Sequence, residues 1–306
     1  MKNYMKKLAA LLFIFIFLLL VLLSSSLSKG EINLISPISV QEKVLGINQW
    51  FPGNINAVQL DAPKVTAEAA LFIDTKTGQV FYSKNPNKKL PIASLVKVMT
   101  VLIALEHKNM DDQFTVSQYA ADMEPDKMLL IAGEKLTLKE LLYGIFLISA
   151  NDAAEVLSEG TTGDKDEFIK LMNIKAKQVG MNDSLFVNPT GLDEDSNNSY
   201  SSAYDLAILS RYLIKHYPEI VEISRTPYIY LPVTENHQDY DMYSGINLLT
   251  TYPGVVGLKT GYTPEAGLTL ITLARKESRE VLGVLLGSQA RRDEARNLLN
   301  FSLSAI

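Results

Sequence analysis

Hydrophobic and polar positions follow two periods along the chain, and together they predict strands on either side of a helical middle. Two runs rich in β-branched and aromatic residues, 69–74 and 79–82, flank the turn Lys76-Thr77-Gly78 and predict a hairpin. Two later runs, 267–275 and 281–287, predict a second strand pair, and a helix is expected at 290–302. Apolar residues recur at helical spacing over 95–107, 137–148, 152–160, 165–179 and 203–216.

This order of elements predicts a mixed α/β fold. Thr137 and Glu140 have the spacing of a capping box, and Gly180 suits the end of the helix at 165–179. Strands, a long helical middle, further strands and a closing helix favour an antiparallel sheet flanked by helices, with a mostly helical subdomain.

The first 28 residues have the pattern of an export segment. Three lysines precede Leu8–Leu23, a run of sixteen residues without a polar side chain, and serines follow at 24–28. As a helix this run spans about 24 Å, which is short of a hydrocarbon core of about 30 Å. Both a cleaved signal peptide and an N-terminal membrane anchor therefore stay open. Residues 29–66 contain prolines and glycines without a lasting period and predict a spacer, and 67–306 predict one domain.

Composition excludes several kinds of chemistry. The 306 residues contain no cysteine, which excludes disulfides, a thiol nucleophile and thiolate metal sites. The histidines His107, His216 and His237 are isolated and do not have the spacing of metal ligands. A net charge of −5 argues against a nucleic-acid surface. Ser, Lys, carboxylates and Tyr remain as candidate functional groups, and we expect no cofactor.

Ser94 and Lys97 form the first candidate catalytic pair. Lys97 is the single charged residue in the run from Leu90 to Leu105, so its helix should be buried. Residues three apart share a helix face, and a desolvated lysine has a lowered pKa, so Lys97 could accept the proton of the Ser94 hydroxyl. The alternative is that Ser94 caps the helix and Lys97 extends to the surface.

Ser149 and Asn151 form a second candidate group, because they lie in a short turn between two predicted helices. Their hydroxyl and amide could relay a proton and hold a peptide, although both residues, and Asp152 after them, would also serve as helix caps.

The sequence Lys-Thr-Gly occurs twice. We assign the first copy, at 76–78, to the hairpin turn. The second copy, Lys259-Thr260-Gly261, precedes an alternating strand pattern, where an ammonium and a hydroxyl could bind a substrate carboxylate and the glycine could let the backbone approach a ligand.

The motifs SxxK, SxN and KTG occur here in the order found in penicillin-recognising serine enzymes, and the chain resembles their low-molecular-weight D-alanyl-D-alanine carboxypeptidases, peptidase family S11. The resemblance covers about 68–290. It also includes Gly133-Glu134, Gly180-Met181, Phe186-x-Asn188-Pro189-x-Gly191-Leu192 and Tyr252–Thr263. It implies a β-lactamase/transpeptidase-like fold and action outside the bacterial cytoplasmic membrane, at its outer face, in the cell wall or in the periplasm.

The resemblance also implies a role for each site residue. Ser94 would attack the penultimate D-alanine carbonyl of a peptidoglycan stem peptide with Lys97 as base, and water would hydrolyse the acyl-enzyme. Ser149 would relay protons and Asn151 would bind the peptide amide. Lys259, Thr260 and Gly261 would form the carboxylate side of the site, and the N–H groups of Ser94 and Tyr262 would form the oxyanion hole. β-Lactam antibiotics would acylate Ser94, and an uncleaved N-terminal segment would add the membrane as a partner.

Two segments depart from the family pattern. The phrase 198–205 begins with Asn198-Ser199 where relatives usually have His, and has Ser202 where they have Thr; Val256 stands where Asp is frequent. A non-catalytic penicillin-binding or peptidoglycan-sensing module therefore stays open as an alternative, and a β-lactamase is a third interpretation.

Overall fold

The computed structural model describes residues 52–53, 61–193 and 198–304. The chain divides into two units, 1–43 and 44–306, and all that follows concerns the second. The predicted export segment and most of the predicted spacer lie outside the described residues. Within the part of the chain that is described, no helix has both the length and the apolar character needed to cross a membrane.

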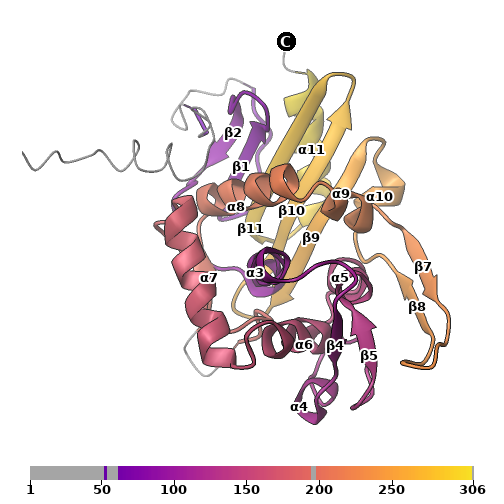
Figure 1. Ribbon diagram of the computed structural model, residues 1–306. Coiled ribbons are helices and arrows are strands. Elements are labelled where there is room, and N and C mark those ends of the chain that lie inside the picture. Colours follow the sequence, from indigo (N-terminus) through magenta and orange to yellow (C-terminus); the bar gives the residue numbers. More distant parts are fainter. Residues whose placement is uncertain (1–51, 54–60, 194–197, 305–306) are drawn as a thin grey trace, which may run out of the picture. The chain divides into compact units, whose positions relative to one another are not determined.

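A five-stranded antiparallel sheet forms one half of the fold (Figure 1). Its strands are β1 (Ala69–Asp74), β2 (Val80–Lys84), β9 (Val255–Thr263), β10 (Gly267–Lys276) and β11 (Arg279–Ser288), in the order β2-β1-β11-β10-β9. Both predicted strand pairs are confirmed, since β1 pairs with β2 and β10 with β11. The sequence analysis did not predict β9, which forms one edge of the sheet beside β10.

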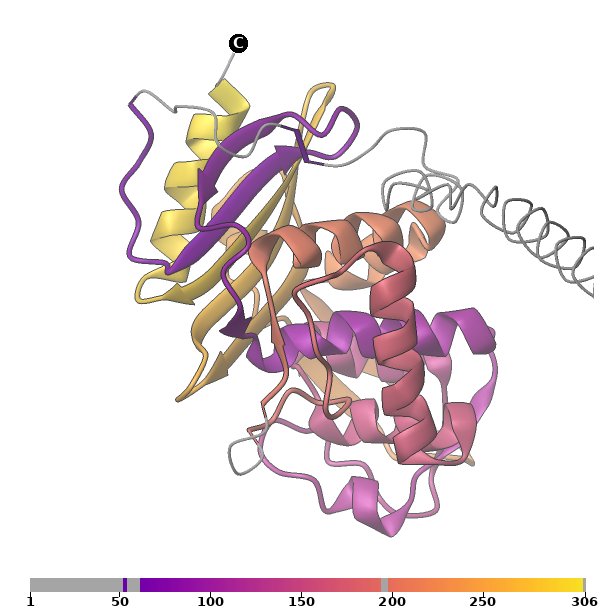
Figure 2. The same ribbon diagram turned by 90° about the vertical axis from the view of Figure 1, so that its left-hand side faces the viewer.

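Helices cover both faces of this sheet, and this explains why its central strands are apolar at consecutive positions. On one face, Phe72 and Leu285 join a cluster with Leu298 and Leu299 of α11 (Arg291–Ser304). On the other face, Ile73 belongs to the larger core that the remaining helices share. Figure 2 shows α11 on one side of the sheet and the helical part of the fold on the other.

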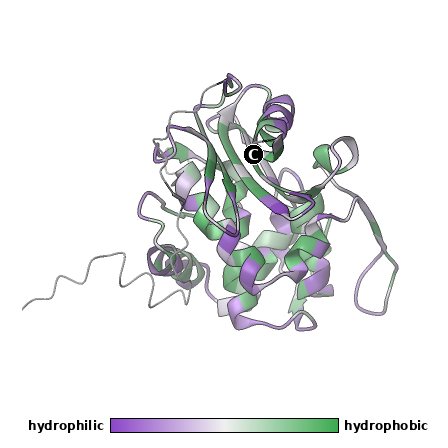
Figure 3. Ribbon diagram, turned by 90° about the horizontal axis from the view of Figure 1, so that it is seen from above, coloured by the Kyte–Doolittle hydropathy of each residue, from purple (hydrophilic) through white to green (hydrophobic). Residues whose placement is uncertain are grey.

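The helical part is built around a buried central helix. Its elements are η1 (Ala93–Val96), α3 (Lys97–His107), α4 (Gln118–Ala121), α5 (Leu138–Leu147), α6 (Asn151–Thr162), α7 (Lys165–Val179), α8 (Ala203–His216), α9 (Glu219–Ser224) and α10 (Leu248–Thr251). All nine residues from Lys97 to Leu105 are buried, as the continuous apolar run predicts. Figure 3 shows the apolar colouring concentrated on these inner helices and strands.

Local sequence signals locate several helix ends correctly. Thr137 and Glu140 form the predicted capping box at the start of α5, with both reciprocal hydrogen bonds present. Gly180 ends α7 in a left-handed conformation at φ 88°. The predicted helix at 95–107 begins as a short 3₁₀ turn, η1, before it becomes α-helical at Lys97.

Three small two-stranded sheets were not predicted. They pair β3 (Leu90–Pro91) with β6 (Tyr200–Ser201), β4 (Gln113–Thr115) with β5 (Lys135–Thr137), and β7 (Tyr228–Leu231) with β8 (Tyr240–Tyr243). Their strands have four residues or fewer, too few for an alternating pattern to stand out from loop sequence.

Residues that precede the predicted domain start at 67 contact the β1–β2 turn and α11. The Gly53 N–H donates to the Gly78 carbonyl at 2.8 Å, and the Thr66 N–H donates to the Glu294 carboxylate on α11.

Candidate active site

Ser94 lies in the 3₁₀ turn η1 at the start of the buried helix. The residue before it, Ala93, has a positive φ of 49°, a conformation that costs energy for a residue with a side chain. Ser94 itself is half-buried. Its hydroxyl oxygen accepts a hydrogen bond from the Lys97 ammonium, which gives it a role other than the helix cap considered above.

Lys97 is fully buried, so the alternative in which it extends to the surface is wrong. Its Nζ donates to Ser94 Oγ at 2.9 Å, to Asn151 Oδ1 at 2.7 Å and to the Thr190 carbonyl at 2.6 Å. Burial lowers the pKa of Lys97 to about 7, although the Asp126 and Asp152 carboxylates partly oppose this shift. A substantial fraction of Lys97 is therefore neutral near pH 7 and able to accept a proton.

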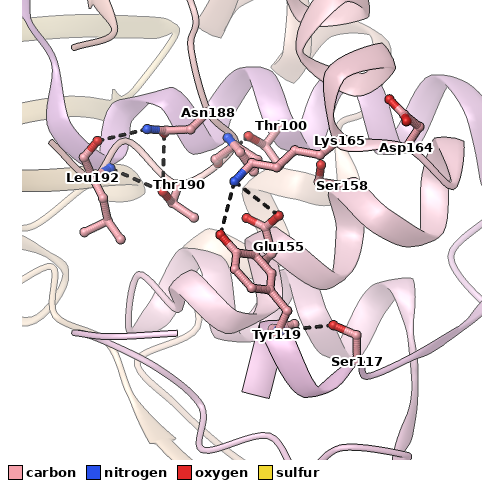
Figure 4. Close-up of polar contacts among 12 residues, drawn as sticks. Thr100, Ser117, Tyr119, Glu155, Ser158, Asp164, Lys165, Asn188, Thr190 and Leu192 are labelled. Carbon is pink, nitrogen blue, oxygen red and sulfur yellow. Dashed lines mark hydrogen bonds and ion pairs between the residues drawn. The ribbon is translucent and has the colours of Figure 1, made fainter. Parts of the chain in front are cut away.

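The loop at 188–192 contributes the carbonyl that meets Lys97. The Asn188 side chain holds this loop, because its Oδ1 accepts from the Gly191 N–H at 2.7 Å and its Nδ2 donates to the Leu192 carbonyl at 2.9 Å (Figure 4). A second tie runs from the Thr100 hydroxyl on α3 to the Pro189 carbonyl at 2.6 Å. These bonds fix the loop against the catalytic helix.

Gly191 allows that loop to approach Ser94. It has a φ of 80°, and a Cβ placed there would lie 2.1 Å from the Ala93 carbonyl oxygen and 3.1 Å from the Ser94 nitrogen. A side chain at 191 would therefore displace the backbone that carries Ser94.

Ser149 and Asn151 lie at the start of α6, and the structure gives their side chains partners across the site. Ser149 has a φ of 65°, and its hydroxyl accepts from Lys259 Nζ at 2.8 Å. Asn151 binds Lys97 through its carbonyl oxygen, and its amide donates to the Pro125 carbonyl. The capping interpretation is therefore replaced by contacts within the site.

Asp152 holds the loop that faces Asn151. Its buried carboxylate accepts from the N–H groups of Met128 at 3.0 Å and Leu130 at 3.2 Å. Burial raises the pKa of Asp152, while these N–H donors favour the charged form and oppose the shift.

Strand β9 brings the second Lys-Thr-Gly close to Ser94. Lys259 is buried, and its Nζ donates to Ser149 Oγ at 2.8 Å and to the Thr260 carbonyl at 2.7 Å. Burial lowers the pKa of Lys259 well below its usual value, and the positive charges of Lys97 and Arg291 lower it further. The two lysines thus influence each other's protonation.

Gly261 lets β9 pass directly beside Ser94. A Cβ at this position would lie 2.9 Å from the Ser94 nitrogen and 2.6 Å from Thr269 Oγ1. The next residue, Tyr262, has a side chain that is 63% exposed. The backbone of β9 and the N–H of Ser94 therefore lie on the same side of the site.

Arg291, at the start of α11, is a site residue that the sequence analysis missed. Its Nη1 donates to the carbonyls of Gly261 at 2.6 Å and Thr269 at 3.2 Å. It lines a cavity of about 130 Å³ together with Thr260 and the segment 245–248. Burial lowers the pKa of Arg291, and the guanidinium still places a positive charge beside Thr260.

All the predicted site residues therefore meet at the junction between the buried helix and the edge strand. The first Lys-Thr-Gly does lie in the β1–β2 turn, where the Asp74 carboxylate accepts from the N–H groups of Lys76 and Thr77. Besides Arg291, the carbonyls of Pro125 and Thr190 were missed, because a backbone carbonyl has no sequence signature.

A separate buried ion pair lies between α6, α7 and α4. Lys165 Nζ is 3.6 Å from the buried carboxylate of Glu155 and lies over the ring of Tyr119, 5.4 Å from its centroid (Figure 4). This pair ties the three helices together.

Comparisons with known proteins agree on the family. The family model for D-alanyl-D-alanine carboxypeptidases, peptidase S11, matches residues 56–290. The carboxypeptidase DacF of Bacillus subtilis is 37% identical over 246 residues, which are 78% of this chain and 62% of DacF. The chain thus spans less than two thirds of that relative's length.

Solved structures confirm the predicted fold class. A D-alanyl-D-alanine carboxypeptidase from Mycobacterium tuberculosis matches with a TM-score of 0.75 and 26% identity, over 84% of this chain and 97% of that one. Penicillin-binding protein D2 from Listeria monocytogenes, in its cefotaxime-bound form, matches with a TM-score of 0.67 and 30% identity, over 79% and 99% of the two chains.

Proposed function

The chain belongs to the peptidase S11 family of D-alanyl-D-alanine carboxypeptidases, and we propose on this premise that it is a serine carboxypeptidase that removes the terminal D-alanine of peptidoglycan stem peptides. The observation that carries the proposal is the fully buried Lys97, with its amine 2.9 Å from Ser94 Oγ and a pKa lowered to about 7. A serine activated by a neutral amine can attack a peptide carbonyl without a histidine.

In the first step, the neutral amine of Lys97 takes the Ser94 proton as Ser94 Oγ bonds to the penultimate D-alanine carbonyl carbon. The N–H groups of Ser94 and Tyr262 donate to the oxyanion that forms. The bond from carbon to the amide nitrogen then breaks, and Ser149 relays the proton held by Lys97 to the nitrogen of the departing D-alanine, which returns Lys97 to its neutral form. Water afterwards hydrolyses the ester on Ser94, with Lys97 again as base.

The substrate supplies a negative charge to a site that contains several positively charged side chains. Lys259, Thr260 and the guanidinium of Arg291 bind the terminal carboxylate, and Asn151 binds the peptide amide. A carboxylate beside Lys259 favours its charged form, and this charge in turn favours the neutral, basic form of Lys97. The substrate would thereby promote the protonation state that its own cleavage requires.

The same geometry makes β-lactams inhibitors. Their strained amide occupies the position of the scissile bond, and their carboxylate meets Lys259 and Thr260. The acyl group then stays on Ser94. The cefotaxime-bound form of the Listeria relative supports this part of the proposal.

We also propose that the protein acts outside the cytoplasmic membrane, in cell wall biogenesis and cell shape, with residues 1–28 as signal peptide or anchor. The apolar run Leu8–Leu23 supports this location. Mass spectrometry of the mature N-terminus from cell fractions separates cleavage from anchoring, and an intact N-terminus in the cytosolic fraction contradicts export.

Labelling with fluorescent penicillin and release of D-alanine from a pentapeptide test the activity together. Wild type should be labelled and should release D-alanine, Ser94→Ala should do neither, and Lys97→Ala should lose at least most of both. Labelling without D-alanine release would favour a non-catalytic penicillin-binding module. Rapid nitrocefin turnover would indicate a β-lactamase.

A further inference from the structure

The β7–β8 hairpin presents a face of exposed tyrosines. Tyr228, Tyr230 and Tyr243 point away from the core, with side chains 43%, 50% and 67% exposed. Tyr228 and Tyr243 are direct cross-strand partners, and their ring centroids are 4.6 Å apart. The Asp239 carboxylate interacts with the Tyr230 hydroxyl and Asp241 with the Tyr228 hydroxyl. We call these three tyrosines and two aspartates the tyrosine face.

The core-facing side of the hairpin is fixed by packing and hydrogen bonds. Its inward side chains Leu231, Tyr240 and Met242 are buried in the main core. The Tyr240 hydroxyl donates to the Glu134 carboxylate, which also accepts from the Gln238 N–H at 2.8 Å. The tyrosine face is therefore a rigid platform, and binding to it costs little conformational entropy.

The base of the hairpin is attached to the active site. Gly245, two residues after Tyr243, donates its N–H to the Leu147 carbonyl at 2.8 Å, and Leu147 is two residues before Ser149. Gly245 also begins the segment that lines the cavity beside Thr260. From this base the strands run beside α5, which both of them contact, to a tip where the Asn236 carbonyl accepts from the Lys135 N–H of β5 (Figure 1). The tyrosine face is thus joined at its base to the segment that lines the cavity beside Thr260.

The chemistry of the tyrosine face selects the kind of ligand. Residues 226–245 include the acids Glu235, Asp239 and Asp241 and no lysine or arginine, so an anionic lipid or polymer would be repelled. Exposed tyrosine rings pair an apolar surface with a hydroxyl, which suits the C–H faces of a pyranose ring. Neighbouring carboxylates accept hydrogen bonds from sugar hydroxyls.

We propose that the tyrosine face binds the glycan strand to which the stem peptide is attached. This inference rests on the proposed function, because it names a second part of the same substrate. In peptidoglycan the scissile bond is near one end of the stem peptide and the sugar is at the other, up to about 14 Å away when the four intervening residues are extended. A sugar-binding face beyond the catalytic cleft matches that arrangement.

The test compares two substrates that carry the same pentapeptide, one free and one attached to soluble glycan strands. In the double variant Tyr228→Ala/Tyr243→Ala, kcat/KM should fall about tenfold for the glycan-linked substrate, the loss expected for two aromatic contacts, and stay within about twofold for the free peptide. The matched control Tyr119→Ala removes a tyrosine that is 55% exposed on α4 and should change neither value selectively.

Equal losses on both substrates, unchanged cleavage of the glycan-linked substrate, or the same selective loss in Tyr119→Ala would overturn the proposal. Cosedimentation with glycan strands stripped of their peptides measures binding without catalysis. Wild type should bind them and the double variant should not. If wild type cleaves neither substrate, the proposed function fails while this binding result still decides the inference. A wild-type dimer that the double variant dissociates would instead make the tyrosine face a contact between two copies of the chain.

Discussion

Replacing Gly191 by alanine tests whether the 188–192 loop positions the nucleophile. In the structure, a Cβ at 191 would lie 2.1 Å from the Ala93 carbonyl oxygen, whereas ordinary contact begins at 3.4 Å. The Ala93–Ser94 peptide and the loop must therefore separate by about 1.3 Å, the difference between these two distances. Because Asn188 and Thr100 fix the loop, much of this movement falls on the backbone of Ser94.

The expected consequence is a large loss of acylation with a modest loss of stability. A misplacement of about 1 Å of a reacting group can cost about 100-fold in rate, so the second-order rate of Ser94 acylation by fluorescent penicillin should fall by about that factor. Alanine at a φ of 80° adds about 1–2 kcal/mol of backbone strain, which a folded domain of this size tolerates. Thermal unfolding measures that cost separately.

Gly163→Ala is the matched control for backbone strain. Gly163 ends α6 at a φ of 76°, and nothing lies within 4 Å of the Cβ that alanine would add. The control should lose a similar free energy of unfolding and keep its acylation rate. If Gly191→Ala were acylated at the wild-type rate, or if Gly163→Ala lost as much of its acylation rate as Gly191→Ala, the argument that the loop acts through the position of Ser94 would be refuted.

Three further predictions concern protonation. Because Lys97 must be neutral to act as a base, acylation of wild type should rise with pH with a midpoint near 7; a flat profile from pH 5 to 9 would contradict this role. Bound penicillin favours the charged form of Lys259, so in Lys259→Gln the midpoint measured at saturating penicillin should move to higher pH, and an unchanged midpoint would show that the two lysines titrate independently. Burial raises the pKa of Asp205 to about 6, so its contribution to stability is complete below about pH 4 and is lost as the pH rises through 6, on the order of 3 kcal/mol. The unfolding free energy of Asp205→Asn should lack this decline between pH 4 and 7, and parallel curves for the two proteins would exclude it.

The sequence predicts most of the helices because their signals are local. The ends of α7 and α8 agree with the predicted ranges, since a capping residue and an apolar period determine each one, together with Gly180 at the end of α7. The strands of the two main hairpins are predicted for the same reason. Ser94, Lys97, Ser149, Asn151 and the second Lys-Thr-Gly were identified from short motifs in a characteristic order.

What the sequence did not predict depends on contacts between distant segments. Strand β9 contains glycines at 257 and 261, which weaken strand propensity, and its pairing with β10 overrides that local preference. Arg291 falls in the predicted helix at 290–302, and it reaches the Gly261 carbonyl because α11 packs against the sheet. The carbonyl groups of Pro125 and Thr190 enter the site only through the path of the backbone.

The same burial that makes Lys97 reactive also makes the site costly to build, and the structure shows how the surrounding residues support it. Two lysines are buried side by side, and Ala93 and Ser149 both have positive φ values. Such conformations persist only where neighbouring contacts determine them, and each has a support in place. The Thr190 carbonyl and Asn151 satisfy the Lys97 ammonium, and Asp152 holds the loop behind Asn151. Because these supports come from separate segments of the chain, substitutions that loosen any of them should reduce acylation more than stability.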